Sequence, residues 1–256
     1  MHAQLDRPRG DDLSWLEELA REMVKNLPKD AFTDWTFGFG DLQRVVDLVE
    51  KAVERNAAET AEAGRAAAIK AAADPSHSFV KRPVFAPMAA ELWKSETTFP
   101  RVLRNALLVA IYSHIEYLLL SWCESISPDP TVSEQLKKRK NDESYPGRYL
   151  RYLRDDAGID LGDFTKWPEW ELIDGYRRAR NCLAHRGGIV DGEEDRQKIA
   201  TLPHIEIDDS GLQLIEPIVH LRPGACQAAS ETAKAFVERA VTTAQRDARW
   251  DGSKRE

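Results

Sequence analysis

The 256-residue chain has few cysteines, and these lie far apart. Cys123, Cys182 and Cys226 are odd in number and form no Cys-x-x-Cys pair. Such spacing excludes a disulfide framework and a metal site built on a cysteine pair. Because reduced, unpaired cysteines are typical of the cytosol, we expect a cytoplasmic protein.

Long apolar runs, excess positive charge and glycine are scarce as well. Residues 1–10 are polar with no signal core, and the apolar run at 107–111 is far shorter than the roughly 20 residues of a membrane helix. We therefore expect no membrane segment. The formal net charge of -7 excludes a general nucleic-acid coat protein but leaves room for a local basic surface. With 14 glycines and 31% charged residues, the composition favours a helical fold over a sandwich or barrel.

Apolar residues recur at helical spacing along most of the chain, which predicts an all-α fold with one minor β-hairpin. Residues 101–126 are apolar around most of the circumference and should form the central core helix. Alternating residues at 205–207 and 212–215 flank Asp-Asp-Ser-Gly and predict the hairpin. The expected helices span residues 13–27, 41–73, 101–126, 147–157, 167–185 and 224–249, with a short helix beginning at Thr131.

Two segments between helices are expected to be irregular. Residues 33–40 are aromatic and glycine-rich and predict a packed loop, and residues 76–95 are punctuated by proline. We place a boundary at the second segment. Residues 1–95 then form an N-terminal helical extension of unknown role, and residues 96–256 form the main helical domain.

The end of the predicted helix 167–185 carries the side chains of greatest chemical interest. Arg180 is a permanent cation, Asn181 is an amide, and His185 is an imidazole able to act as a general acid or base near neutral pH. A glycine pair follows and should end the helix. Guanidinium and imidazole together can stabilise a phosphodiester and move its protons without a metal. Their spacing corresponds to about 140° on an ideal helix, so the two do not share one face.

The stretch from residue 101 to 188 resembles the HEPN superfamily (higher eukaryotes and prokaryotes nucleotide-binding). Residues 107–118, LLVAIYSHIEYL, are similar to the family's early core helix with its embedded acidic residue. Residues 180–185, RNCLAH, are similar to the family's Arg-x4-6-His signature, in which a polar residue directly follows the arginine. The resemblance implies a HEPN-like helical bundle over residues 96–256 that forms a homodimer with two motifs facing one cleft.

The resemblance also implies an activity, a metal-independent endoribonuclease acting on RNA in a toxin–antitoxin, phage-defence or RNA-processing system. His185 would shuttle the proton of an attacking 2′-hydroxyl, Arg180 would stabilise the pentavalent phosphorus, and Asn181 would orient the phosphate or the histidine. The products would be a 2′,3′-cyclic phosphate and a 5′-hydroxyl. We expect no metal and no cofactor. An antitoxin or defence protein is the implied partner, although Gly187 stands where some toxins carry a tyrosine that an antitoxin modifies.

Further residues are candidates for supporting roles. Glu116, on the core helix, could orient Arg180 or His185. The candidate RNA-binding residues are basic and lie at the end of the short helix that begins at Thr131 or in and directly after the motif helix: Lys137, Lys138, Arg139, Lys140, Arg177 and Arg186. The run 137–140, together with Arg148, Arg151 and Arg154 at i, i+3, i+6 spacing, is alternatively explained as a solvated face.

A catalytically silent protein is the alternative interpretation. Arg180 and His185 would then be a cation and an imidazole placed favourably at a helix C-terminus. In that case the HEPN-like module would bind RNA, a nucleotide or a partner protein without cleaving anything. Trp167 and Trp170 are expected to pack in the core rather than to stack on bases, and Cys182 to be buried without a chemical role.

Overall fold

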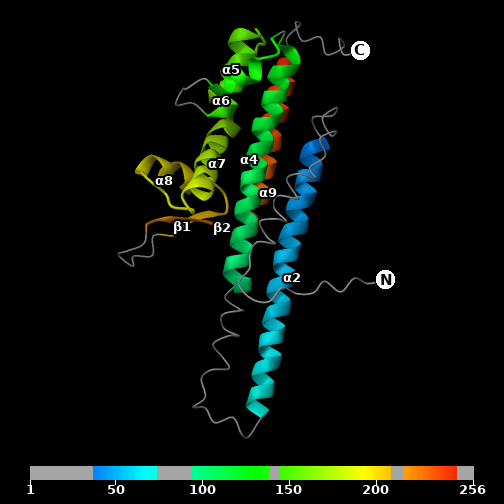
Figure 1. Cartoon of the computed structure of the whole chain (residues 1–256), viewed down its shortest axis with the longest axis vertical. Coiled ribbons are helices and arrows are strands. Elements are labelled where there is room, and N and C mark those ends of the chain that lie inside the picture. Colours follow the sequence, from blue (N-terminus) through cyan, green and yellow to red (C-terminus); the bar gives the residue numbers. More distant parts are fainter. Residues whose placement is uncertain (1–36, 74–93, 128, 139–143, 209–215, 247–256) are drawn as a thin grey trace.

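A computed structural model describes residues 37–73, 94–127, 129–138, 144–208 and 216–246. This part of the chain is mostly helical, with a single two-stranded antiparallel hairpin, so the predicted fold class of helices with a minor hairpin is confirmed. The long helices α2, α4 and α9 run beside one another, and α7 packs against α4 and α9 (Figure 1). The predicted helix 13–27 lies outside the described residues.

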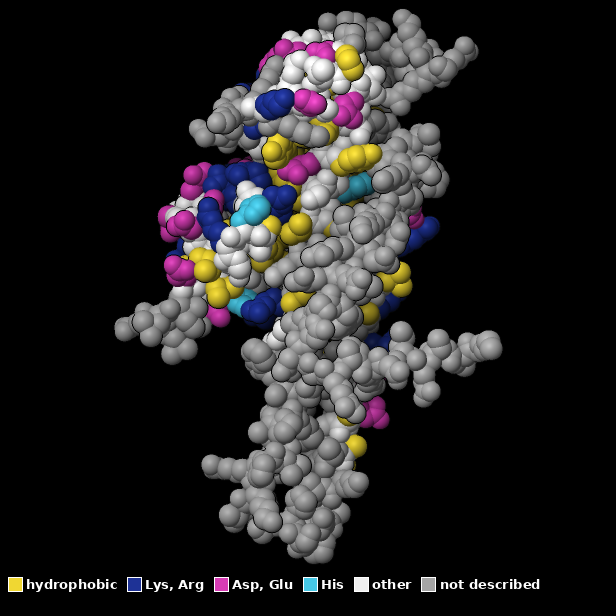
Figure 2. All heavy atoms as spheres, in the orientation of Figure 1, with side chains coloured by type: hydrophobic (Ala, Val, Ile, Leu, Met, Phe, Trp, Pro, Cys, Tyr) yellow, Lys and Arg dark blue, Asp and Glu magenta, His cyan; other side chains and the backbone are white. Residues whose placement is uncertain are grey.

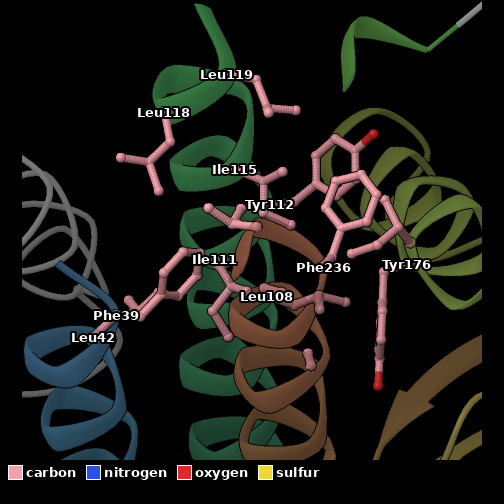
Figure 3. Close-up of a cluster of buried hydrophobic side chains, with 14 of the residues drawn as sticks. Phe39, Leu42, Leu108, Ile111, Tyr112, Ile115, Leu118, Leu119, Tyr176 and Phe236 are labelled. Atoms are coloured by element: carbon pink, nitrogen blue, oxygen red, sulfur yellow. The ribbon is translucent and has the colours of Figure 1, made fainter. Parts of the chain in front are cut away.

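Helix α4 (Phe99–Ile126) is the central core helix that the apolar sequence predicted. Pro100 occupies its first turn, where a missing backbone N–H costs nothing. Its apolar side chains are buried on several sides, facing α2, α7 and α9 (Figure 3). By length and composition alone α4 would be long enough to cross a bilayer, but about half of its most apolar stretch is buried within the bundle.

Helix α2 (Phe37–Ala73) begins earlier than the sequence suggested. Residues 37–40, predicted as part of a loop, form its first turn, so that part of the loop prediction was wrong. Packing explains the difference: Phe39 is buried, and its ring meets the His114 ring of α4 edge-on at a centroid distance of 5.0 Å. This burial outweighs the weak helix propensity of the neighbouring glycines. Residues 33–36 of the predicted loop lie outside the described residues.

The first half of α2 belongs to the common hydrophobic core. Phe39 and Leu42 face Leu108 and Ile111 of α4 (Figure 3), and three valines continue the buried stripe along the helix. A buried ion pair adds to this contact: the Arg104 guanidinium donates two-pronged hydrogen bonds to Glu50, with Nε–Oε1 at 2.8 Å and Nη2–Oε2 at 2.6 Å. The boundary predicted at residue 95 remains a prediction, but α2 and the later helices share one core.

Shorter elements follow α4. Helices α5 (Val132–Lys138) and α6 (Tyr145–Arg151) lie beside its C-terminal half, and a π-helical turn, η4 (Tyr152–Asp156), continues from α6. These two segments together take the place of the single helix predicted at 147–157. A 3-10 turn, η5 (Phe164–Lys166), then leads into α7 (Pro168–His185), which starts and ends as predicted.

The region after α7 differs most from the prediction. Helix α8 (Glu193–Ala200) was not expected from the sequence. Strand β1 (Ile205–Asp208) matches the prediction, but its partner β2 is Ile218–Leu221 rather than residues 212–215, which lie outside the described residues. The register pairs Ile205 with Leu221, and Ile189 extends the sheet through a bridge to Ile218. The position of the second strand is set by its pairing with β1, which lies about ten residues earlier in the chain. The local alternation of apolar and polar residues does not reveal that pairing.

Helix α9 (Ala225–Gln245) closes the bundle against α2, α4 and α7. Its buried face consists largely of small residues, which allow close packing of the neighbouring helices. Phe236 interrupts that face and meets Trp167 and Trp170 at ring centroid distances of 5.9 and 6.1 Å. The prediction that both tryptophans pack in the core is therefore confirmed.

Candidate functional site

The glycine pair after α7 ends the helix at His185 and so presents this side chain to solvent. The backbone amides of Arg186 and Gly188 both donate to the Cys182 carbonyl, at 3.0 and 2.9 Å. Gly187 and Gly188 adopt φ values of 62° and 93°, which residues with a Cβ rarely adopt. His185 is exposed and has no hydrogen bond or ion pair to another described residue. Its imidazole nitrogens are open to an incoming ligand.

Arg180 is half-buried one and a half turns before that end. Its Nη1 donates to Asn181 Oδ1 at 3.0 Å, and its Cζ lies 5.9 Å from the centroid of the Tyr112 ring on α4. The Nε atom is buried and has no hydrogen-bond partner among the described residues. Because the Asn181 oxygen accepts from Arg180, the two N–H donors of the Asn181 amide are directed elsewhere and remain for other groups.

Helix α4 presents Tyr112 and Glu116, one turn apart, to this arginine. Burial raises the pKa of Glu116, and the positive charge of Arg180 opposes the rise, so the carboxyl lies within electrostatic reach of the guanidinium. Burial also raises the pKa of Tyr112, with Glu116 adding to the rise and Arg177 opposing it. The structure thus brings Glu116 beside Arg180, while its orienting role stays a prediction. Sequence reasoning missed Tyr112, although its i, i+4 spacing to Glu116 was visible.

Carboxylates neutralise the other arginines of α7. Asp174 accepts from Arg177 Nε at 2.9 Å and from Arg178 Nε at 3.0 Å, and these hydrogen bonds lower the pKa of Asp174 against the opposing effect of burial. Arg178 also binds Asp195 and Glu194 at the start of α8. Arg178 therefore fixes α8 against the motif helix and is not available to a ligand.

Two of the basic candidates for RNA binding, Arg177 and Arg186, lie on or directly after α7. Arg177 is about one-quarter exposed and ion-paired to Asp174. Arg186 follows His185 directly and is 44% exposed, with Nη1 3.7 Å from Asp195 Oδ2 and 3.8 Å from Asp191 Oδ2. Distances this long leave its guanidinium only loosely held. Of the motif's neighbours, Arg186 is thus the cation best placed to meet a phosphate beside His185.

The basic run on α5 lies apart from this end of α7. Figure 1 shows α5 near the upper end of α4, well away from α8 and the hairpin that flank His185. Lys138 is exposed and pairs with Glu134 through Nζ–Oε2 at 3.0 Å. Lys137 lies on the same helix with its side chain outside the described part, and Arg139 and Lys140 lie outside the described residues. Their predicted role in RNA binding stays untested.

Positive and negative side chains are mixed around the motif. On the face seen in Figure 2, Lys and Arg gather over the region of α7 and α8, with Asp and Glu at the outer edge. Among the described residues no group of three or more His, Cys, Asp or Glu side chains is arranged to hold a metal ion. Cys182 is buried as expected, and burial raises the pKa of its thiol, which makes it a poor nucleophile.

Comparison with known proteins adds no relative. No family model, curated protein or solved structure matches this chain. Its candidate function therefore depends on the arrangement of Arg180, Asn181 and His185 and on the α4 residues that face them.

Proposed function

We propose that this protein is a metal-independent endoribonuclease of the HEPN type that acts as a homodimer in the cytoplasm. The observation that carries the proposal is the contrast along the last turns of α7. Arg180 is half-buried and constrained by Asn181 and by Tyr112, whereas His185 is exposed at the glycine-stopped end. A constrained cation and a solvent-open imidazole are the two groups that RNA transesterification requires.

The proposed reaction uses the substrate's own 2′-hydroxyl as the nucleophile. The 2′-oxygen forms a bond to the adjacent phosphorus, and its proton passes to the imidazole of His185. The P–O5′ bond then breaks, and the 5′-oxygen takes a proton from the imidazolium. The products are a 2′,3′-cyclic phosphate and a 5′-hydroxyl, so no water is consumed in this step.

Arg180 and Asn181 act on the phosphate in this proposal. The Arg180 guanidinium is always charged and offers a planar set of donors to the equatorial oxygens of the pentavalent phosphorus. The two N–H donors of Asn181 are not used by Arg180, so they can orient the same phosphate. Glu116 stabilises the position of the guanidinium by its charge. The 140° separation of Arg180 and His185 on one helix explains why a second copy of the chain is needed to complete the site.

The experiment is RNA cleavage in the presence of a chelator, with the wild type compared with His185→Ala, Arg180→Ala and Asn181→Ala. We expect the wild type to release fragments ending in a 2′,3′-cyclic phosphate. General acid–base catalysis contributes about 10²–10⁴-fold, so His185→Ala should lose at least about 100-fold. Light scattering should give the mass of a dimer.

The matched control is His204→Asn, which replaces another exposed histidine. His204 has a φ of 58°, a conformation that asparagine tolerates, so this variant should fold and cleave as the wild type does. Cleavage that survives His185→Ala unchanged, or a wild type inactive on a broad set of RNAs, would refute the enzyme. RNA binding without cleavage would instead identify the silent module.

A further inference from the structure

A shallow pocket lies between α4 and α6. Its volume is about 230 Å³, and its lining comprises Glu116, Tyr117 and Leu120 from α4 with Tyr145 and Tyr149 from α6. Tyr117 and Tyr145 are 47% and 41% exposed, which is unusual for side chains of their size in the described part of the chain. Three aromatic rings around one carboxyl group distinguish this pocket from the second hollow, between α2 and α9, which is lined mostly by charged residues.

Glu116 connects the pocket to the candidate catalytic residues. The same carboxyl lines the pocket and lies within electrostatic reach of Arg180. Its negative charge contributes to the raised pKa of Tyr149, which lines the pocket, and to that of Tyr112, which faces Arg180 of α7. Glu116 therefore couples the pocket electrostatically to the guanidinium that would bind the phosphate.

The aromatic side chains provide surfaces on which a planar ring can stack. Tyr145 and Tyr149 are stacked on each other, with a centroid distance of 6.0 Å and an interplanar angle of 28°. The Arg148 guanidinium lies 4.9 Å from the Tyr145 ring centroid and donates to the Leu136 carbonyl at 2.8 Å, so the Tyr145 ring packs against a side chain that is itself anchored. Protein aromatic rings stack on nucleobases in this way in many single-stranded RNA complexes.

The carboxyl group determines which base fits best. An ionised carboxylate only accepts hydrogen bonds. The Watson–Crick edge of guanine presents two adjacent N–H donors, from N1 and N2, that match the two oxygens of a carboxylate. Adenine and cytosine each present a ring-nitrogen acceptor beside their amino group, and uracil presents one N–H between two carbonyls, so each of these would place an acceptor against the carboxylate.

We propose that the α4–α6 pocket binds a guanine base of the RNA substrate, stacked on the exposed Tyr117 ring and hydrogen-bonded to Glu116. The inference rests on the proposed function, because the base is read as part of the RNA whose phosphate Arg180 would hold. Pockets for drug-sized ligands measure roughly 300–1,000 Å³. A pocket of about 230 Å³ is smaller than these and suits a single base. Burial of the Glu116 carboxyl, which destabilises its anion, would be compensated by the two donors of guanine.

The test measures nucleotide binding separately from cleavage. Titration of the full chain with 5′-GMP, 5′-AMP, 5′-CMP and 5′-UMP, followed by calorimetry and tyrosine fluorescence, should show at least about 10-fold tighter binding of GMP, which corresponds to one extra good hydrogen-bonded pair. Glu116→Gln should remove most of this preference, because its amide nitrogen meets the guanine donors. Tyr117→Ala should weaken the binding of GMP about 10-fold through lost stacking. Tyr145→Ala should weaken it less, because the Tyr145 ring already packs against Tyr149 and Arg148.

The control is Glu124→Gln, an exposed glutamate two turns further along the same helix. It should keep the preference for GMP, and circular dichroism should show that all variants fold.

Equal binding of the four nucleotides, or a preference that survives Glu116→Gln, overturns the inference even if RNA is cleaved. Preferential GMP binding without any RNA cleavage would support the assignment of the pocket and refute the proposed nuclease activity. Dissociation of a dimer by Tyr117→Ala and Tyr145→Ala, with no nucleotide bound, identifies the pocket as a subunit interface and overturns the inference.

Discussion

At the scale of residues, the candidate site contains polar groups that the fold leaves incompletely satisfied. The Arg180 Nε and the Tyr112 hydroxyl are buried without a hydrogen-bond partner among the described residues. An unsatisfied buried donor costs about 1–3 kcal/mol, and most proteins avoid it. Both side chains are within electrostatic reach of Glu116. The interior beside the motif helix therefore holds hydrogen-bonding capacity that the described residues do not satisfy.

Single residues were predictable from the sequence only where their neighbours along the chain decide their position. The place of His185 at the exposed end of a helix followed from the two glycines after it. Arg148 was expected on a surface because it recurs with other arginines at helical spacing, yet it is buried and donates to the Leu136 carbonyl. That contact joins α5 to α6, and helical spacing within one segment carries no information about it.

His114 should make the stability of the fold depend on pH. Its ring is largely buried at the edge-on contact with Phe39, and burial lowers the pKa of His114 to about 4 from 6.5. The unfolded chain thus binds a proton near pH 6.5 that the folded chain binds only near pH 4. The contribution of His114 to the free energy of unfolding is therefore fully present above pH 6.5 and is lost as the pH falls from 6.5 towards 4. At pH 5 the loss amounts to about 2 kcal/mol.

Urea unfolding of the wild type and His114→Gln at pH 7.5 and pH 5.0 tests this. The wild type should lose about 2 kcal/mol more than the variant on acidification, after other titrating groups cancel in the comparison. An equal loss in both proteins would show that His114 is not the group responsible.

At the scale of elements, the sequence predicted those helices whose apolar pattern is strong. α4 and α9 carry long apolar stripes, and α7 begins with a proline and ends at glycines, so their positions were visible locally. α8 was not, because seven of its eight residues are poor markers of a buried face and Ile199 alone is buried. Its position depends on ion pairs with Arg178 of α7, which are long-range contacts.

The buried pair Glu50–Arg104 should be essential for joining α2 to α4. Both side chains are about 10% exposed or less. Replacing one partner leaves the other as a buried charge without compensation, which costs about 3–5 kcal/mol, whereas replacing both by apolar residues of similar size costs much less. We expect Arg104→Met and Glu50→Met each to lower the free energy of unfolding by that amount, and the double variant to recover most of it.

A double-mutant cycle in urea measures this coupling directly. Arg44→Met, with Asp41→Asn as its partner change, provides a control on the same helix, because that ion pair is exposed and should contribute less than about 1 kcal/mol. Additive losses at Glu50 and Arg104 would show that the pair does not couple the two helices.

At the scale of the whole molecule, the first half of α2 and the later helices share one hydrophobic core. Five apolar side chains of α2 are buried in it: Phe39, Leu42, Val46, Val49 and Val53. They lie against α4 and α9, which also support α7 and thereby the candidate site. The boundary at residue 95 was predicted from the prolines of residues 76–95, and this local feature does not report where the first half of α2 packs.

A truncated chain of residues 96–256 should therefore not fold alone. Burial of an apolar side chain contributes about 1.5–3 kcal/mol, so losing five removes on the order of 10 kcal/mol, which is comparable to the 5–15 kcal/mol total stability of most domains. It would also leave Arg104 buried without Glu50. We expect the truncated chain to aggregate or to lack a cooperative unfolding transition, and a peptide of residues 37–73 added in trans to restore helicity and the transition. A truncated chain that unfolds cooperatively on its own, with the wild-type midpoint, would establish residues 96–256 as an independent domain and assign α2 a role outside the core.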